Sequence, residues 1–365
     1  MCVGKSCCEF CANSTNNNSY EKIPINHIKG FSAKKFVENL LKNGSEIYCD
    51  DSVPSFNNQN DLPPFYDENM YKRGQAFFHK HIFSICFGNF LGLLADLSIQ
   101  SSLSLLILTG MSGSDYKAYK RYISTMLHML IWYEDDFRPG SKLWISIRDV
   151  RNKHNTASKR AKLVIKYRIN QKDMIMAQWG FMGLVVARSE YLGIHEPDEY
   201  SWKCFIHLWR VIGYILGVTD EFNICRESVQ ETREICDEIG KNVIRPEIAK
   251  RHIRHWEMCT YLVNGLNVLN PFLELHSSIF YLEAALNTNF YLSDKNENYR
   301  KLDAVAKRRL RIMIFFIEKM RYQWMRICLN YLQMISLWLV KRFPIAGYFK
   351  FGIAKSHFNI MGKHE

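Results

Sequence analysis

The chain has 365 residues, of which 47% are hydrophobic and 14% aromatic, so it can bury one large core or two smaller ones and is not a disordered chain. Its formal net charge of +12 favours anionic partners, whether nucleic acid, membrane headgroups or an acidic cofactor. Only nine prolines interrupt long runs of helix-forming residues, and the sequence therefore predicts a mostly α-helical protein.

The N-terminal residues 1–30 are rich in Asn, Ser and Cys, which predicts a flexible tail. This segment contains four cysteines, Cys2, Cys7, Cys8 and Cys11. They could ligate zinc or carry acyl groups, but we interpret the segment as a short flexible tail. No apolar signal segment precedes them, and eleven cysteines in such a chain are typical of thiols in a reducing compartment. We therefore expect a cytoplasmic protein.

Two apolar segments raise the question of a membrane. Residues 84–110 contain Asp96, Gln100 and several serines, so we expect two packed helices around a break and not a membrane span. Residues 327–340 are too few to span a bilayer and are followed by Lys341 and Arg342. That segment suits a buried helix or a helix on a membrane surface.

Residues 112–130 carry the first polar stripe. Ser112 or Ser114 can cap a helix here, and Arg121, Thr125 and His128 then recur at spacings of four and three residues along one helix face. A guanidinium, a hydroxyl and an imidazole in this arrangement can form a hydrogen-bonding wall that faces a ligand. The same stripe is also compatible with an exposed polar face.

A basic cluster follows, with ten Lys or Arg between residues 142 and 172 against Asp149 alone. Residues 162–169 (KLVIKYRI) alternate in polarity, which predicts a short strand or loop.

Within this cluster Trp144, Ile147, Arg151 and His154 share one helix face, at spacings of three, four and three. A neutral imidazole on that face could bind a metal, and the arginine could pair with a carboxylate. Alternatively, His154 caps the end of the helix, where the helix dipole favours it.

Residues 202–218 carry a third stripe. His207, Arg210 and Tyr214 recur at three and four residues, while Gly213 and Gly217 allow a flat group or another helix to approach the backbone. Helix packing alone would explain the glycines, but it explains the polar line less well.

Five segments together resemble the rubber-oxygenase catalytic domain, a family that includes latex-clearing proteins and oxygenases bound to the endoplasmic reticulum. The segments are, in this order, RGQ at 73–75, RYIST at 121–125, VRNKH at 150–154, QKDM at 171–174 and HLWRVIGYILGV at 207–218. The resemblance covers about residues 70–270. It implies an all-α fold with a globin-like helical core and additional helices in a single large domain, residues 31–350, followed by a C-terminal tail, residues 351–365.

The resemblance also implies haem b as the cofactor. His154 would be the proximal ligand of the iron, and Arg151, its neighbour in the family's arginine-x-x-histidine motif, would hold a haem propionate or orient the proximal helix. Arg121 and Thr125 would be the catalytic residues of the distal helix. The third stripe adds His207 and Arg210 to the expected cofactor-binding residues.

Two positions depart from the family pattern. The distal lysine of latex-clearing proteins falls at Ser124, and the upstream glutamate implicated in base catalysis falls in residues 102–110, which contain no carboxylate. His128 or His207 could replace that base, or each could be a structural histidine.

The sequence thus predicts a haem b-dependent oxygenase, an oxidoreductase that acts with O₂ on a hydrophobic, isoprenoid-like or lipid-like small molecule. The alternatives are a haem-binding sensor or carrier without turnover, and a basic adaptor at a membrane surface or on nucleic acid. Nucleic acid is not an expected partner, because no recognisable nucleic-acid motif is present. A cytoplasmic protein of this kind could also bind peripherally to the endoplasmic reticulum membrane.

Overall fold

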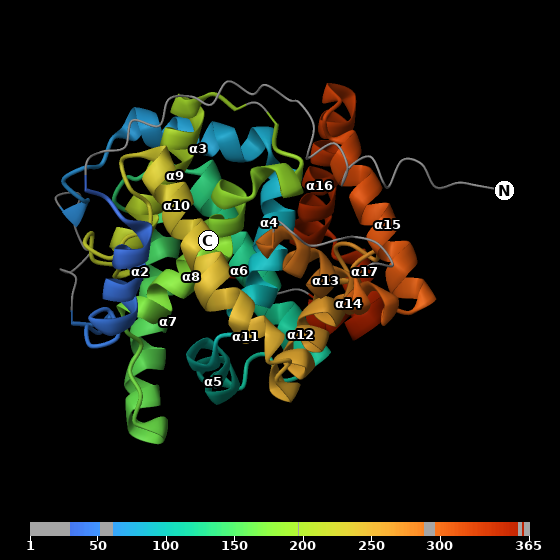
Figure 1. Cartoon of the computed structure of the whole chain (residues 1–365), viewed down its shortest axis with the longest axis horizontal. Coiled ribbons are helices and arrows are strands. Elements are labelled where there is room, and N and C mark those ends of the chain that lie inside the picture. Colours follow the sequence, from blue (N-terminus) through green and yellow to red (C-terminus); the bar gives the residue numbers. More distant parts are fainter. Residues whose placement is uncertain (1–29, 52–60, 196, 288–295, 357–359, 361–365) are drawn as a thin grey trace.

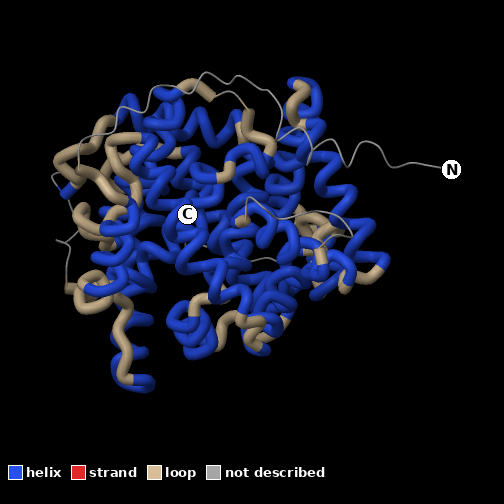
Figure 2. The backbone as a smooth tube through the Cα atoms, in the orientation of Figure 1, coloured by secondary structure: helices blue, strands red, loops and turns tan. Residues whose placement is uncertain are grey.

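Helices dominate the computed structural model, which describes residues 30–51, 61–195, 197–287, 296–356 and 360 (Figures 1 and 2). This described part of the chain contains no β-strand and one isolated bridge, between Tyr48 and Asn170. The all-α prediction is therefore confirmed. Apart from residue 30, the predicted N-terminal tail with its four cysteines lies outside the described residues.

The helices follow one another along the chain in this order. They are α2 (Ala33–Lys42), α3 (Glu68–Lys80), α4 (Ile82–Asp96), α5 (Gln100–Thr109), α6 (Asp115–Glu134), α7 (Lys142–Ile165), α8 (Gln171–Ala187), the 3₁₀-helix η2 (Ser189–Leu192), α9 (Glu199–Leu216), α10 (Val229–Ile239), the π-helix η3 (Gly240–Ile244), α11 (Arg245–Ala249), α12 (Ile253–Leu266), α13 (Leu275–Leu286), α14 (Glu297–Arg300), α15 (Ala304–Lys319), α16 (Gln323–Arg342), α17 (Ile345–Phe351) and α18 (Ile353–Ser356).

Helix α8 lies at the centre of the bundle and is buried on nearly all sides (Figure 1). Helices α2, α4, α9 and α10 all pack against it, while α3 packs along α9 and α12 along α6. A capping box between Asn170 and Asp173 fixes the start of α8 and satisfies its first backbone donors. A helix that is apolar all round needs this kind of enclosure.

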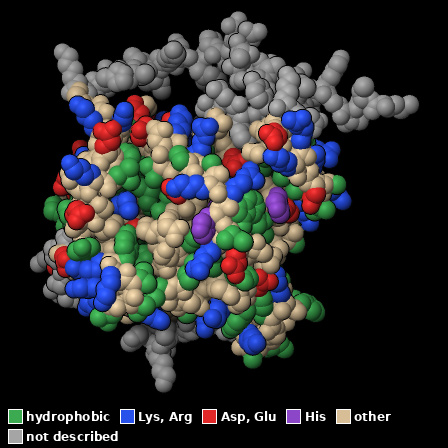
Figure 3. Space-filling model, turned by 60° about the horizontal axis from the view of Figure 1, so that its bottom comes forward, with side chains coloured by type: hydrophobic (Ala, Val, Ile, Leu, Met, Phe, Trp, Pro, Cys, Tyr) green, Lys and Arg blue, Asp and Glu red, His purple; other side chains and the backbone are tan. Residues whose placement is uncertain are grey.

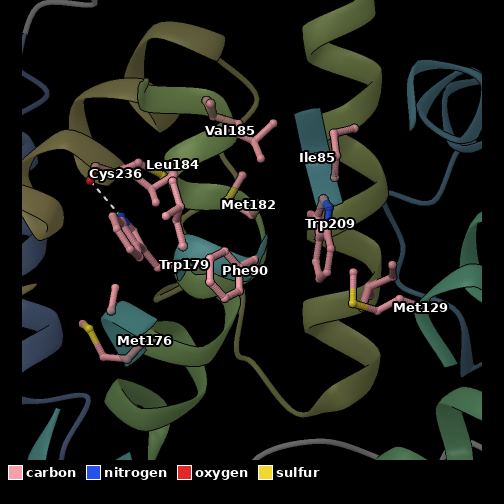
Figure 4. Close-up of a cluster of buried hydrophobic side chains, with 14 of the residues drawn as sticks. Ile85, Phe90, Met129, Met176, Trp179, Met182, Leu184, Val185, Trp209 and Cys236 are labelled. Carbon is pink, nitrogen blue, oxygen red and sulfur yellow. Dashed lines mark hydrogen bonds between the residues drawn. The ribbon is translucent and has the colours of Figure 1, made fainter. Parts of the chain in front are cut away.

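Large aromatic side chains fill the space around α8 (Figure 4). The indole nitrogen of Trp179 donates a hydrogen bond of 2.8 Å to the carbonyl oxygen of Cys236, so this buried polar group is paired. Phe181 stacks on Trp209 of α9 with ring centroids 5.6 Å apart. These contacts join α8 to both α9 and α10.

Helices α4 and α8 cross at two glycines. A methyl group on Gly92 would overlap the carbonyl group of Gly180, so the two backbones touch at this point. Glycine is needed here because any side chain would force the helices apart.

The apolar run of residues 84–110 forms two helices, as expected. Helices α4 and α5 meet at an angle of 93° across a short break. Among the described residues, no single helix is long and apolar enough to cross a membrane, although this bent pair passes the same test of length and composition when taken together.

Helix α7 is longer than the sequence indicates. Its N-cap is Ser141, whose side chain accepts a hydrogen bond from the Trp144 backbone, and its C-cap is Lys166, which has φ 55°. His154 therefore lies inside the helix, three turns before its end, and the alternative of a helix-capping histidine is wrong. Residues 162–165 are helical, so the prediction of a strand is also wrong, and a loop begins only after Lys166.

The C-terminal helices pack on one edge of the bundle (Figure 1). Residues 353–356 of the predicted tail form α18, and the Tyr119 hydroxyl of α6 donates a hydrogen bond of 3.2 Å to the Ser356 carbonyl oxygen. Hydrophobic side chains remain exposed among Lys and Arg on the face shown in Figure 3.

Gly92→Ala should lower the free energy of unfolding by about 1–3 kcal/mol, because the added methyl group overpacks the α4–α8 contact. The matched control is Gly113→Ala, since a methyl group there meets no atom within 4 Å. Urea unfolding of both variants measures the difference. Equal stability of the two would contradict the close backbone contact.

Candidate functional site

A partly open cavity of about 530 Å³ lies between α6, α7, α8 and α9, and we call it the central cavity. This volume is within the range of about 300–1,000 Å³ that small-molecule sites occupy. Apolar side chains form much of its wall, among them Met174, Phe181, Trp209 and Ile212. Polar groups enter it mainly from α6 and α7, where Arg121, Ser124, Thr125, His128, Lys153 and His154 line the wall.

His154 of α7 is enclosed by protein and lines the central cavity. Its Nδ1 atom is buried and has no hydrogen-bond partner. Burial and the positive charges of Arg121 and Lys153 lower its pKa to about 4. The imidazole is therefore neutral at physiological pH, and one of its nitrogens offers a lone pair.

Arg121 of α6 lines the same cavity. Its Nη1 atom donates a hydrogen bond of 3.0 Å to Oγ1 of Thr109, and burial lowers its pKa, although Tyr122 and Asp96 act in the opposite direction. Within the described residues, Arg121 forms no ion pair. An enclosed cation of this kind favours an anionic or electron-rich group in the cavity.

Thr125 lies one turn after Arg121, as its spacing predicts, and it also lines the cavity. Its hydroxyl, however, donates a hydrogen bond of 3.1 Å to the Arg121 carbonyl oxygen of the preceding turn. In this rotamer the hydroxyl proton is already used, so Thr125 presents lone pairs to a ligand. In the predicted hydrogen-bonding wall, Thr125 thus supplies an acceptor and no free donor.

His128 lies one turn further along α6, and its ring is held by the protein. Its Nδ1 atom is 2.8 Å from Oγ of Ser146, and its Nε2 atom is 3.4 Å from Nζ of Lys153. Because an ammonium group can only donate, Nε2 accepts and Nδ1 carries the proton. Burial, with the charge of Lys153 as a smaller cause, lowers the His128 pKa to about 4, so this histidine is a neutral support of the cavity wall.

The structure places two predicted cofactor-binding residues away from the central cavity. Arg210 forms a two-point ion pair with Asp220, at 2.9 and 2.7 Å, and lies over the ring of Phe65. His207 accepts a hydrogen bond of 3.1 Å from the Asp67 backbone nitrogen through Nε2. Both residues fix the segment before α3 and the turn after α9. Gly213 of the same helix does line the cavity.

Arg151 also lies outside the cavity wall. It is 9% exposed, and its charged or titratable neighbours are Cys49, Asp61 and Tyr214. Arg151 and His154, which are one turn apart on α7, thus face different neighbours. Two lysines that the stripes did not single out, Lys120 and Lys153, line the cavity in its place.

Asp96 is a carboxylate that the sequence stripes did not connect with the site. It ends α4, and its Oδ1 atom accepts a hydrogen bond of 2.9 Å from the Ser102 hydroxyl. Burial raises its pKa to about 6, while the Arg121 charge acts in the opposite direction. Its position in a strongly apolar run was the only sequence signal for an unusual environment.

The central cavity adjoins a second cavity, which in turn adjoins a groove. A middle cavity of about 110 Å³ shares Thr125 and Phe181 with it. An outer groove of about 340 Å³, bordered by α15 and α16, shares six residues with the middle cavity. The shared residues are Phe83, Phe87, Leu269, Asn270, Leu273 and Gln333. Common walls therefore join the α16 surface to the Arg121 side of the central cavity.

Comparison with known proteins finds no matching family profile and no matching curated protein sequence. Among solved structures, the chain is similar to a latex clearing protein, LCP, in its closed state. The TM-score is 0.51 and the sequence identity 14%, and the likeness covers 84% of this chain and 89% of LCP. The single-domain, globin-like fold inferred from the sequence resemblance is thus confirmed at the level of the fold.

The raised pKa of Asp96 predicts a pH-dependent stability. Because its folded pKa, about 6, lies above its ordinary value of 3.8, the folded state binds the proton more tightly, and stability from this group falls as pH rises from about 4 to above 6. An Asp96→Asn variant has no carboxyl group at this position, so it does not lose this stability as the pH rises. Its stability relative to the wild type should increase by up to about 3 kcal/mol between pH 4 and pH 7.5.

Urea unfolding at both pH values measures this difference. Asp198→Asn is the matched control, because hydrogen bonds from Ser201 lower the Asp198 pKa and the pH effect should have the opposite sign. A wild type and an Asp96→Asn variant with parallel pH profiles would show that the carboxyl group is not perturbed.

Proposed function

We propose that this chain binds haem b in the central cavity and acts as a haem-dependent oxygenase on a hydrophobic, isoprenoid-like or lipid-like small molecule. One observation carries the proposal. A neutral His154 lines the same cavity as Arg121, a cation without an ion pair in the described residues. The LCP-like fold and the order of the five sequence segments support it.

The residues present fit a haem group. A flat, dianionic and largely apolar cofactor needs a nitrogen ligand, cations for its propionates and apolar walls for its ring. His154 offers the ligand, and Met174, Phe181 and Trp209 belong to the apolar wall. Gly213 is part of the same wall, and a side chain at this position would overlap the side chain of Gln178. When bound, haem supplies an iron that activates O₂.

The protein groups then have separable roles. His154 stays neutral and available as a ligand because its low pKa prevents protonation above about pH 4. Lys153 is held near the cavity by an ion pair of 2.6 Å with Asp149, and it can pair with a propionate at the rim. Arg121 can donate a charge-assisted hydrogen bond to negative charge that develops on an oxygen atom. Lys153 thus takes the propionate-binding role that the resemblance implied for Arg151. Thr125, whose hydroxyl bonds to the backbone, has a smaller role than expected.

The adjoining cavities support a hydrophobic substrate. Both the middle cavity and the outer groove are lined mainly by Phe, Leu and Met side chains. Because the middle cavity shares Thr125 with the central cavity, an apolar molecule in it would lie next to Thr125, one turn after Arg121. Apolar walls favour such a molecule over a polar one, which would lose its hydration without new hydrogen bonds.

His154→Ala should abolish most haem binding, because it removes the proposed nitrogen ligand. The purified variant should show less than about a tenth of the wild-type haem absorbance, on the scale of a lost ligand, and added imidazole should restore part of it. His207→Ala is the matched control, since that histidine lies outside the cavity and should leave the haem spectrum unchanged. If the two variants bind haem alike, His154 is not the ligand.

Turnover separates an oxygenase from a carrier. We expect the haem-loaded protein to consume O₂ in the presence of squalene, and Arg121→Leu to slow this reaction roughly ten- to a hundredfold while haem content is kept. Thr125→Val should have a much smaller effect, because its hydroxyl bonds to the backbone. An O₂ electrode and product analysis measure this. Haem binding without O₂ consumption would instead indicate a sensor or carrier.

A further inference from the structure

The C-terminal helices expose an apolar stripe that the haem site does not explain. On α16, Trp324, Ile327, Tyr331, Ile335 and Trp338 follow one another at three or four residues and are all exposed. Phe349 on α17 is 90% exposed. We call the stripe on α16 together with Phe349 the C-terminal apolar face.

The opposite side of α16 is already occupied by the protein. Met325, Leu329 and Leu337 are buried, and Met325 and Leu329 form a hydrophobic cluster with Ile317 and Met320 at the end of α15. Helix α16 is therefore apolar on both sides, although only one side packs on the bundle. A soluble surface helix ordinarily places polar residues on its outer side, so the exposed stripe fits a second apolar contact.

Charge identifies the kind of partner. Residues 304–356 contain eleven Lys or Arg and one acidic residue, Glu318. Basic residues border the stripe at both ends of α16, with Arg321 and Arg326 near its beginning and Lys341 and Arg342 at its end. An anionic surface would attract this region, whereas a second copy of the chain would bring the same positive charge toward it.

The side chains also match the depth profile of a lipid surface. Tryptophan and tyrosine prefer the boundary between headgroups and hydrocarbon, and Trp324 and Trp338 stand at the two ends of the stripe, about 21 Å apart along the helix. Long basic side chains can reach headgroups from the same depth. A helix with one side on the protein and one apolar side outward suits a position in the plane of the membrane.

We propose that the C-terminal apolar face binds the surface of a membrane that contains anionic lipids, with α16 lying parallel to that surface. The outer groove lies beside this face, because Leu332 lines the groove, is exposed and directly follows Tyr331. A lipid-soluble molecule leaving the membrane could therefore reach the outer groove directly. Membrane binding itself does not depend on haem.

Flotation of the full chain with lipid vesicles tests the proposal. The probes are vesicles of phosphatidylcholine with 30% phosphatidylserine, on the order of charge in an anionic leaflet, and vesicles of phosphatidylcholine alone. The wild type should bind the anionic vesicles and release them at high salt. The double variants Trp324→Ser/Trp338→Ser and Lys341→Glu/Arg342→Glu should each bind at least tenfold more weakly, with unchanged circular dichroism and haem content.

The matched control is Leu163→Ser/Val164→Ser on α7. These two side chains are also exposed, at 75% and 61%, and they lie among basic residues, but they do not belong to the C-terminal apolar face. This variant should bind as the wild type does. The proposal is overturned if no vesicle is bound, if only the α7 variant loses binding, or if sedimentation shows that the α16 substitutions break a dimer and leave vesicle binding intact.

Discussion

The enclosure of a guanidinium and a neutral imidazole around one cavity is the constraint on which the functional account depends. Taking Arg121 out of water is unfavourable, and its hydrogen bond to Thr109 and the field of Asp96 offset only part of that cost. An anionic or electron-rich ligand in the cavity would offset the rest of this desolvation cost. The same low-polarity surroundings keep His154 neutral, so one environment prepares both groups.

The scaffold holds the helices that bring these two groups to one cavity. The backbone contact between Gly92 and Gly180 holds α4 on α8, and the stack of Phe181 on Trp209 holds α8 on α9. With α8 and α9 fixed as two walls, α6 and α7 close the cavity and carry its polar side chains. Ser146 of α7 also joins His128 and Trp132 of α6 through hydrogen bonds of 2.8 and 3.0 Å, which sets the spacing between the two helices.

Residue spacing could predict the helices and part of the site. The face with Arg121, Thr125 and His128 does line the cavity, because α6 borders it over several turns. The same reasoning placed Arg151 beside His154, yet residues three apart on a helix differ by about 60° in direction, enough to face different neighbouring helices. His207 and Arg210 were misplaced for a related reason. Their partners, Asp67 and Asp220, come from loops whose positions no helical pattern reveals.

Long-range packing determined what the sequence did not show. Asp96 comes near Arg121 only because α4 and α5 bend by 93°, and Lys153 enters the site because its ion pair with Asp149 directs it toward His128. For residues 327–340, composition excluded a membrane span but left a buried helix and a helix on a membrane surface both open. Which side of that helix is exposed required the fold.

A crystal structure of the haem-loaded protein tests the central claim most directly. The account predicts density for one haem between α6 and α7, with a His154 nitrogen coordinated to the iron and Arg121 on the side of the ring away from His154. Lys153 should lie within hydrogen-bonding reach of a propionate. A haem held by another residue, or bound only to the exposed basic surface of α7, would contradict the account.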